Sequence, residues 1–395
     1  MNYRLTRRIN AIQPSPTLAV TQRAAELKAA GKDVIGLGVG EPDFDTPEFI
    51  KAAAIDAIHQ GHTKYTAVDG IKPLKQAVIA KLKRDNQLDY QLDEILISAG
   101  GKHSIANLLS VWLEAGDEAI IPAPYWVSYP DMVKLVEATP VIVPTTIDQR
   151  YKMTPAQLAQ AITPKTKLLF INSPSNPSGT AYTAAELRAL ADVLVQHPQV
   201  LIATDDMYEH ILWSTEPFAN IAMVAPELRD RIVILSGVSK AYAMTGWRIG
   251  YAAGPQPLIR AMTKMQSQST SNPASISQYA ALAALNGDQS CIATMVNAFK
   301  ARHDYLVDAL NAIPGIECIA GDGTFYVFAR VQGLMRAAGV SNDIELCERL
   351  LVDAGVALVP GSAFGAEGYC RLSFATDLET LQAAVARIEA FAESL

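Results

Sequence analysis

Polar and charged residues follow four short apolar runs of the sequence, at positions where they could share one site. They are the Gly-Gly-Lys at 100–102 after EILIS, Asn176 after LLFIN, the acidic pair 205–206 after VLIAT, and the Ser-Lys at 239–240 after IVILS. Backbone amides of a Gly-Gly turn can bind a phosphate, and a lysine amine can attack an aldehyde. An amide side chain and a carboxylate add a hydrogen bond and a negative charge. These four groups form one candidate site.

Each group also has an ordinary structural explanation. The glycines at 100–101 could make a plain tight turn, and the SPSNPSG segment at 173–179 consists of residues that favour turns. A lone lysine is usually a solvated surface charge. Asp206 is expected to cap a following helix, whereas Asp205 lies one residue closer to the strand, where an unpaired buried carboxylate is costly. The coincidence of all four groups favours a functional site.

Pyridoxal 5′-phosphate is a ligand that needs all four groups. Its phosphate needs the amides, a hydroxyl and an arginine, its aldehyde needs a lysine for a Schiff base, and its protonated pyridine nitrogen needs a carboxylate. Arg248 follows Lys240 closely in the sequence and can supply the arginine. The residues therefore predict a site for this cofactor.

The apolar runs before these residues predict the strands of one sheet. They are short and rich in Val, Ile and Leu, as strands buried on both faces are. Helical patterns separate several of them, and over 104–115 the apolar residues from Ile105 to Leu113, Trp112 included, share one helix face. The seven expected strands are 94–98, 119–121, 141–143, 168–172, 200–204, 232–236 and 249–253.

This alternation favours an α/β fold with a mostly parallel, seven-stranded sheet flanked by helices. In such sheets ligands bind beyond the carboxyl ends of the strands, which is where the four groups fall. We expect a large domain over 46–285. A smaller α+β domain, 286–395, contains a strand near 324–329 and a last helix from Leu378, and an N-terminal arm, 1–45, joins it.

The composition excludes several classes of protein. Of the 395 residues, 50% are hydrophobic and 18% are charged, which excludes an intrinsically disordered chain. The net charge is −7 and no basic stripe is visible, so we expect no nucleic-acid partner. No apolar run is long enough for a membrane span, and none follows the basic start as in a secretory signal. Four cysteines without a CxxC pair predict reduced thiols in a cytoplasmic protein and no metal site.

The segment SGVSKAYAMTGWRIGY at 236–251 joins the Schiff-base lysine to the phosphate arginine. Together with GLGVGEPDFDTP at 36–47 and CRLSF at 370–374, it resembles the class I pyridoxal-phosphate aminotransferases of fold type I, and the likeness covers nearly the whole chain. Within that family, GGKHS, APYWVSY and GVGEPDF resemble the prokaryotic aspartate aminotransferase subgroup. That subgroup includes enzymes that use prephenate.

The resemblance implies a role for each residue around the cofactor. Lys240 would hold the cofactor as a Schiff base and then move the substrate's α-proton, and Asp205 would keep the pyridine nitrogen protonated. Tyr208 and Asn176 would hydrogen-bond the ring oxygen O3′, and Trp126 would stack on the ring. The phosphate would be bound by Gly101, Lys102, Ser239 and Arg248.

The resemblance also concerns the α-carboxylate and the quaternary structure. Arg371 would bind the substrate α-carboxylate through a bidentate pair, assisted by Asn176, Trp126 and the backbone of Gly40. Tyr65, in TKYTAVDG, resembles the tyrosine that reaches the phosphate of the neighbouring subunit. The resemblance therefore implies a homodimer with shared active sites.

A second carboxylate on the substrate needs its own binding groups. By resemblance, Lys102 would bind it, together with Ser15 and Thr17 of the N-terminal arm. A lysine at a helix start is disfavoured by the helix dipole, so its presence there favours a functional role. Two departures from the subgroup, Pro16 and a histidine at 103 in place of glutamine, could alter the substrate range.

We therefore expect transamination of L-aspartate with 2-oxoglutarate to oxaloacetate and L-glutamate, with ping-pong kinetics. Alternatives on the same fold are transamination of prephenate, aromatic amino acids or kynurenine, and C–S lyase β-elimination. A further alternative is a regulatory or binding protein without turnover. A nucleotide-binding Rossmann enzyme is disfavoured, because GLGVGE precedes a proline-containing loop rather than a helix.

Overall fold

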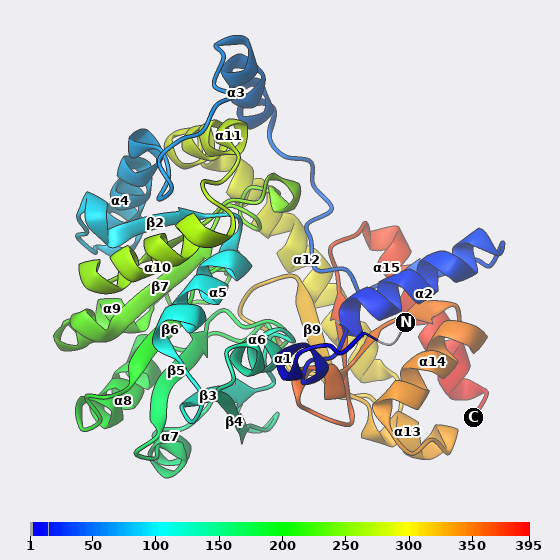
Figure 1. Ribbon diagram of the computed structural model, residues 1–395. Coiled ribbons are helices and arrows are strands. Elements are labelled where there is room, and N and C mark those ends of the chain that lie inside the picture. The colour runs from blue at the N-terminus through cyan, green and yellow to red at the C-terminus, as the bar shows by residue number, and fades with distance from the viewer. Residues whose placement is uncertain (1–2, 15) are drawn as a thin grey trace.

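A seven-stranded sheet forms the centre of the larger half of the molecule (Figure 1). The computed structural model describes residues 3–14 and 16–395, so Ser15 lies outside the described residues. The strands, in spatial order, are β2 (Ile95–Ser98), β8 (Gly250–Ala253), β7 (Ile232–Gly237), β6 (Leu201–Asp205), β5 (Thr166–Asn172), β3 (Glu118–Ala123) and β4 (Thr139–Pro144). The predicted seven-stranded α/β sheet is confirmed.

The strand directions bring the candidate residues to one edge. β4, β3, β5, β6 and β7 run parallel, and β8 runs antiparallel to both of its neighbours, β7 and β2. β2 therefore runs in the same direction as β7. As a result, the carboxyl ends of β2, β5, β6 and β7 meet the amino end of β8, which Arg248 precedes by two residues.

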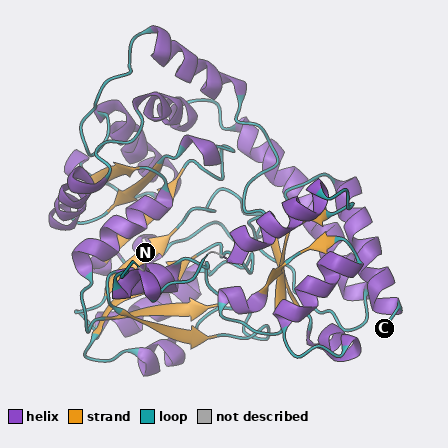
Figure 2. Ribbon diagram, turned by 45° about the vertical axis from the view of Figure 1, so that its right-hand side comes forward, coloured by secondary structure: helices purple, strands orange, loops and turns teal. Residues whose placement is uncertain are grey.

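Strand residues alternate between two cores, as the pleat requires. In β5, Leu168 and Phe170 enter one core, whereas Leu169 and Ile171 enter the other. Fully burying each such side chain contributes about 1.5–3 kcal/mol. Figure 2 shows the strands as an inner layer between helices. One face is covered by α5 (Gly101–Trp112), α6 (Tyr129–Leu135) and α10 (Gln256–Ser269), and the other by α4 (Lys72–Asn86), α7 (Pro155–Ala161), α8 (Ala184–Val195), α9 (Ile221–Val224) and α11 (Ser275–Asn286).

One local prediction is wrong, and one residue differs in exposure from its helix face. Trp112 lies on α5 as expected, but unlike Ile105 and Leu109 it is 36% exposed, and its Nε1 donates to the carbonyl of Lys167 at 2.8 Å. Asp206 does not cap a helix, because the chain leaves β6 in a turn in which the Glu209 amide donates to the Asp206 carbonyl at 3.0 Å. The Asp206 carboxylate is instead buried and accepts hydrogen bonds from side chains behind the sheet.

The smaller half contains a three-stranded antiparallel sheet, β11 (Val359–Pro360), β12 (Tyr369–Ser373) and β9 (Tyr326–Arg330). In the N-terminal arm, β1 (Ile35–Gly36) pairs in parallel with β10 (Val356–Ala357), and α2 (Pro16–Ala29) packs beside them. The helices of this half are α12 (Ser290–Ala312), α13 (Gln332–Ala338), α14 (Asp343–Asp353) and α15 (Leu378–Glu393). The domain boundaries at 45 and 285 stay predictions.

The remaining helices are short or project from the body. α3 (Glu48–His59) projects at the top of Figure 1 and packs against α11. The other short segments are α1 (Arg7–Asn10), η1 (Leu92–Glu94), η2 (Pro226–Arg231), η3 (Thr245–Trp247) and η4 (Gly361–Phe364). Within residues 3–14 and 16–395, no helix is both long and apolar enough to cross a membrane.

Candidate active site

Lys240 lies three residues beyond β7, with its side chain in the space between the two halves. Its Nζ donates to the carbonyl of Gly40 at 2.5 Å and lies 6.0 Å from the centre of the Tyr208 ring. No described carboxylate forms an ion pair with it. Burial, reinforced by the charges of Arg371 and Arg248, lowers the pKa of Lys240 to about 8. A substantial fraction of this amine is therefore neutral near physiological pH, which a nucleophilic lysine needs.

Asp205 is the last residue of β6 and points to the α5–α6 face of the sheet. Its Oδ2 accepts a hydrogen bond from the Tyr129 hydroxyl at 2.5 Å, and its Oδ1 accepts one from the Met207 amide at 3.3 Å. Burial raises the pKa of Asp205, and the Tyr129 hydrogen bond opposes that rise. A buried carboxylate held in this way can pair with a cationic ring nitrogen.

The start of α5 and the guanidinium of Arg248 form a cradle for an anion. Gly100 has φ +92°, and a Cβ there would lie 2.2 Å from Arg248 Nη2, so only glycine allows this approach. Arg248 Nη1 donates to the Thr245 carbonyl at 2.7 Å. Gly101 begins the helix, and Ser239 is buried beside Lys240. The helix N-terminus and the guanidinium together favour a phosphate.

Lys102 and Trp126 lie next to this cradle. The Lys102 Nζ is 4.8 Å from the centre of the Trp126 ring, a cation–π geometry. The Trp126 ring meets Tyr129 edge-on, with 5.3 Å between ring centres. Burial and the charge of Arg248 lower the pKa of Lys102. The Trp126 ring thus lies next to Tyr129, which holds Asp205, and the Lys102 ammonium lies beside the same ring.

Arg371, on β12 of the small sheet, is buried and only partly satisfied. Its Nη1 donates to Asn176 Oδ1 at 3.0 Å and its Nη2 donates to the carbonyl of Gly38 at 2.7 Å, whereas its buried Nε has no partner among the described residues. The guanidinium lies 4.3 Å from the Tyr326 ring centre and 4.9 Å from that of Phe364. Such a guanidinium fits a carboxylate ligand.

Tyr208 and Asn176 are held in fixed positions. The Tyr208 hydroxyl lies 3.0 Å from the Tyr326 hydroxyl, and burial raises the pKa of Tyr208. The backbone N–H of Asn176 donates to Asn172 Oδ1 at 2.9 Å, and Asn172 Nδ2 donates to the carbonyl of Asp205 at 2.9 Å. Asn172, the last residue of β5, therefore ties the Asn176 loop to the end of β6.

Some predicted site residues are not brought to this site. Tyr65 is 90% exposed, and no hydrogen bond between described residues joins it to this site. Thr17 lies in the first turn of α2, where its carbonyl accepts from Thr21 Oγ1 at 2.9 Å, and it makes no hydrogen bond with Lys102 in the described part of the chain. Ser15 is outside the described residues. Gly40 contributes its carbonyl, which contacts Lys240.

Some residues of the site are not predicted from the sequence, among them Gly38, Tyr129, Asn172 and Tyr326. Tyr129 and Asn172 had a signal, since one lies three residues after Trp126 and the other ends the strand before the Asn176 loop. Gly38 contributes only a carbonyl, and Tyr326 comes from the other sheet. No local pattern could have placed these two.

The residues present fit pyridoxal 5′-phosphate. The Gly101 end of α5 and Arg248 suit its phosphate, the Lys240 amine suits its aldehyde, and Asp205 suits its pyridine nitrogen. The orphaned Nε of buried Arg371 leaves a donor for the carboxylate of an amino acid. Fold and site together define a pyridoxal-phosphate enzyme.

Comparisons with known proteins identify the family. A profile described as "Aminotransferase class I and II" matches residues 32–388. The chain is 57% identical to an aspartate/prephenate aminotransferase from Nitrosomonas europaea, over 98% of each chain, and 50% identical to an aspartate aminotransferase from Geobacillus stearothermophilus, over 99% of each. The chain belongs to the class I and II aminotransferases, and membership implies pyridoxal 5′-phosphate and amino-acid and 2-oxo-acid substrates.

Solved structures agree with this assignment. The aspartate aminotransferase from Rhizobium meliloti superposes with a TM-score of 0.96 at 47% identity, over 99% of each chain. The aspartate aminotransferase from Thermus thermophilus with maleate superposes with a TM-score of 0.93 at 40% identity, over 100% of each chain. The fold is therefore that of the aspartate aminotransferases.

Proposed function

We propose that the protein transfers the amino group of L-aspartate to 2-oxoglutarate, giving oxaloacetate and L-glutamate. The observation that carries this proposal is that Lys240 and the buried, partly unsatisfied Arg371 lie in one site, where they donate to the carbonyls of Gly40 and Gly38. Burial and the charge of Arg371 lower the pKa of Lys240 to about 8. The lysine amine is therefore close enough to feel the charge of the guanidinium, whose Nε has no partner among the described residues. Relatives named as aspartate or aspartate/prephenate aminotransferases support the substrate.

The chain's own residues have separate tasks in this reaction. When bound, pyridoxal phosphate supplies an electron sink for the pair left by the α-proton. Arg371 holds the substrate α-carboxylate, and Lys240 Nζ takes and returns the α-proton. Asp205, held by Tyr129, would keep a positive charge at the ring nitrogen. Trp126, which lies beside Tyr129 and Lys102, would cover the ring and help to exclude water.

Lys102 is the group proposed to select dicarboxylic substrates. It is the cation beside Trp126, and burial and Arg248 both disfavour its charged form, so a substrate carboxylate would relieve that penalty. The Thermus thermophilus relative whose structure contains maleate, a dicarboxylate, supports this assignment. Prephenate also carries two carboxylates and is the second candidate, because the Nitrosomonas europaea relative is named for both substrates.

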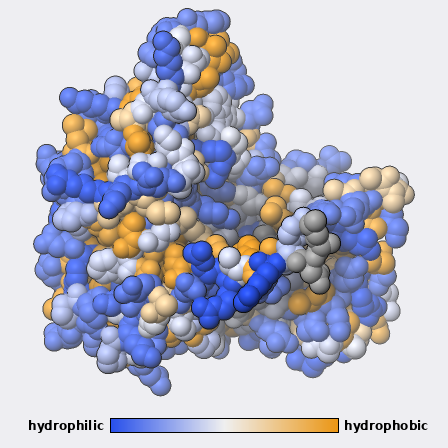
Figure 3. All heavy atoms as spheres, viewed as in Figure 1, coloured by the Kyte–Doolittle hydropathy of each residue, from blue (hydrophilic) through white to orange (hydrophobic). Residues whose placement is uncertain are grey.

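We also propose that the active enzyme is a homodimer in which Tyr65 serves the neighbouring site. Tyr65 is 90% exposed, as expected for a residue that acts outside its own chain. Figure 3 shows hydrophobic atoms on the surface of the projecting segment that contains α3, where Phe49, Ile55 and Ile58 are exposed. This apolar face suits a subunit interface. The cytoplasmic location stays a prediction.

A panel of amino acceptors, at equal concentration and with L-glutamate as donor, tests the substrate assignment. We expect oxaloacetate to be aminated most efficiently, prephenate measurably, and phenylpyruvate least. Equal rates with oxaloacetate and phenylpyruvate would contradict selection by Lys102. Pyruvate release from L-cystathionine, without transamination of any acceptor, would indicate a C–S lyase instead.

A further inference from the structure

Asp205 and Asp206 are consecutive residues whose carboxylates point to opposite faces of the sheet. Asp205 follows the alternation of Leu201 and Ala203 and contacts Tyr129 on the α6 side. Asp206 lies on the other side, where its Oδ2 accepts a hydrogen bond from Asn220 Nδ2 at 2.6 Å. Since the pleat forces this alternation, the site side and the rear side of the turn are mechanically linked.

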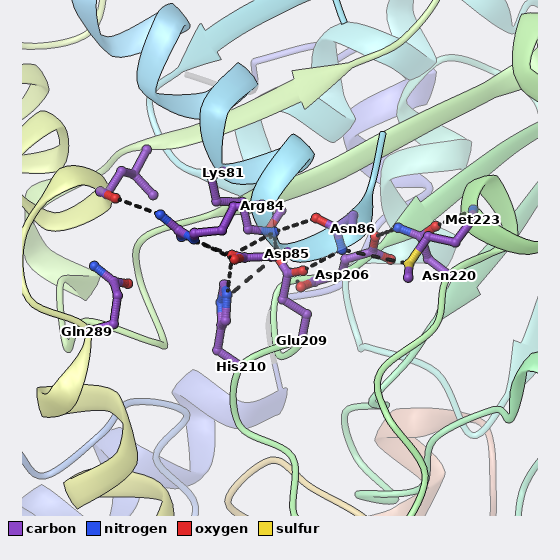
Figure 4. Close-up of polar contacts among 12 residues, drawn as sticks. Lys81, Arg84, Asp85, Asn86, Asp206, Glu209, His210, Asn220, Met223 and Gln289 are labelled. Carbon is purple, nitrogen blue, oxygen red and sulfur yellow. Dashed lines mark hydrogen bonds and ion pairs between the residues drawn. The ribbon is translucent and has the colours of Figure 1, made fainter. Parts of the chain in front are cut away.

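The rear side contains a buried polar cluster that the proposed reaction does not use. This rear cluster consists of Lys81, Asn86, Asp206, Glu209 and Asn220 (Figure 4). The Lys81 ammonium donates to Glu209 Oε1 and, at 2.8 Å, to Asn86 Oδ1. Asn86 Nδ2 donates to Glu209 Oε2 at 3.0 Å. Helix α4 thus grips both carboxylate oxygens of Glu209.

A buried ion pair of this kind is weak evidence for added stability. The side chains of Lys81 and Glu209 are 1% and 5% exposed. Removing one partner of such a pair is strongly destabilising, whereas removing both charges is often nearly neutral. Stability alone therefore does not explain the Lys81–Glu209 pair. The alternative is that the pair fixes one conformation of the turn that carries Glu209.

The charges around the rear cluster are largely paired. Asp85 Oδ2 lies 4.0 Å from Lys81 Nζ and 3.0 Å from His210 Nε2, and Asp85 also accepts from Arg84. Burial alone would lower the pKa of Lys81, but Glu209, Tyr251 and Asp85 together raise it. Figure 4 shows these side chains converging from α4 and from the turn after β6. The turn is thus anchored to α4 by a specific set of contacts.

The spacing within this turn connects the cluster to the site. Asp205 and Tyr208, three residues apart, face the site, whereas Asp206 and Glu209, also three apart, face the rear. We propose that Lys81 and Glu209 are positioning residues, whose contact keeps the Asp205 carboxylate and the Tyr208 hydroxyl in place beside Lys240. This inference rests on the proposed roles of Asp205 and Tyr208 toward the cofactor.

The test compares two double variants of matched chemistry. Lys81→Met/Glu209→Gln removes the rear pair, and Lys152→Met/Glu186→Gln removes an ion pair of 2.6 Å that does not touch the turn. Three quantities are measured on the holoenzymes: the dissociation rate of the cofactor, the pH midpoint of its visible absorption band, and the thermal unfolding midpoint. A wild-type protein without a visible band would contradict the proposed function itself, independently of this comparison.

We expect the rear variant to fold and to release the cofactor roughly tenfold faster than the control variant, which corresponds to a loss of about 1.4 kcal/mol of binding free energy. We also expect the pH midpoint of its visible band to be higher than that of the control variant. Asn86→Ala keeps the ion pair but removes one hydrogen bond from Glu209, and we expect a smaller acceleration, about threefold. A folded variant of either kind whose dissociation rate and pH midpoint equal those of the control overturns the proposal.

Discussion

The Asn176 side-chain oxygen accepts a hydrogen bond from Arg371 Nη1 at 3.0 Å, and this contact joins the large sheet to the small one. Asn176 lies in the loop after β5, whereas Arg371 lies on β12. The proposed α-carboxylate receptor is therefore aligned with the cofactor site by a residue from the other half of the molecule. Substrate binding at Arg371 would therefore depend on the relative position of the two halves.

Arg371→Lys should weaken catalysis for every amino-acid substrate. Lysine keeps the charge but lacks the planar fork, and losing one charge-assisted hydrogen bond costs about 1.5–3 kcal/mol, so kcat/KM should fall roughly 10- to 150-fold. Steady-state kinetics with aspartate, glutamate and alanine measure this, and the visible cofactor band serves as the control. A loss confined to the dicarboxylic substrates would place Arg371 at the other carboxylate.

Lys102→Ala should change specificity rather than chemistry. The variant loses the cation beside Trp126, so kcat/KM for aspartate and glutamate should fall about tenfold or more, while values for alanine and phenylalanine change little. The ratio of aspartate to alanine turnover measures the effect. Equal losses for all four substrates would mean that Lys102 serves the phosphate alone.

Attachment of the cofactor to the apoprotein should follow the protonation of Lys240. Burial lowers the pKa of this amine to about 8, and only the neutral amine is nucleophilic. The rate of appearance of the visible band should therefore rise about tenfold per pH unit below that value and level off above it. Stopped-flow absorbance from pH 6 to 10 measures this. A rate that keeps rising up to pH 10 would contradict the lowered pKa.

Mixed dimers should reveal whether Tyr65 acts in the neighbouring subunit. Tyr65→Ala and Lys240→Ala homodimers should each have low or no activity. A hybrid of the two contains one site with wild-type Lys240 and wild-type Tyr65 only if Tyr65 crosses the interface. We expect activity to return when the two variants are unfolded and refolded together. Hybrids as inactive as the parent variants would contradict the shared site.

Much of the fold could be predicted because each central strand is a short apolar run buried on both faces. In the run from Leu168 to Ile171, consecutive side chains pack alternately into two separate cores. Because both faces of the strand are buried, no polar residue interrupts the run. The same pattern predicts Asn176 and Lys240 just beyond strand ends and Asp205 next to one, and Asp205 is the last residue of β6. The sequence alone groups these residues, since parallel strands bring their carboxyl ends to one edge.

The parts that could not be predicted depend on contacts distant in sequence. Asp206 was expected to cap a helix, but Asn220 and Thr204 hold its carboxylate behind the sheet. Tyr129, which donates to Asp205, comes from helix α6 and not from the sheet that carries Asp205. Trp112 matched the helical periodicity, yet its indole reaches the Lys167 carbonyl at the surface. Local patterns do not encode such pairings.

The absorption spectrum of the purified protein, recorded before and after addition of L-aspartate, tests the central claim most directly. The account predicts a visible band from cofactor bound at Lys240, which aspartate converts to a shorter-wavelength band with release of oxaloacetate. A Lys240→Ala variant should lack the visible band. A visible band that aspartate leaves unchanged would contradict aspartate as the amino donor. No visible band after incubation with pyridoxal 5′-phosphate would contradict the enzyme assignment itself.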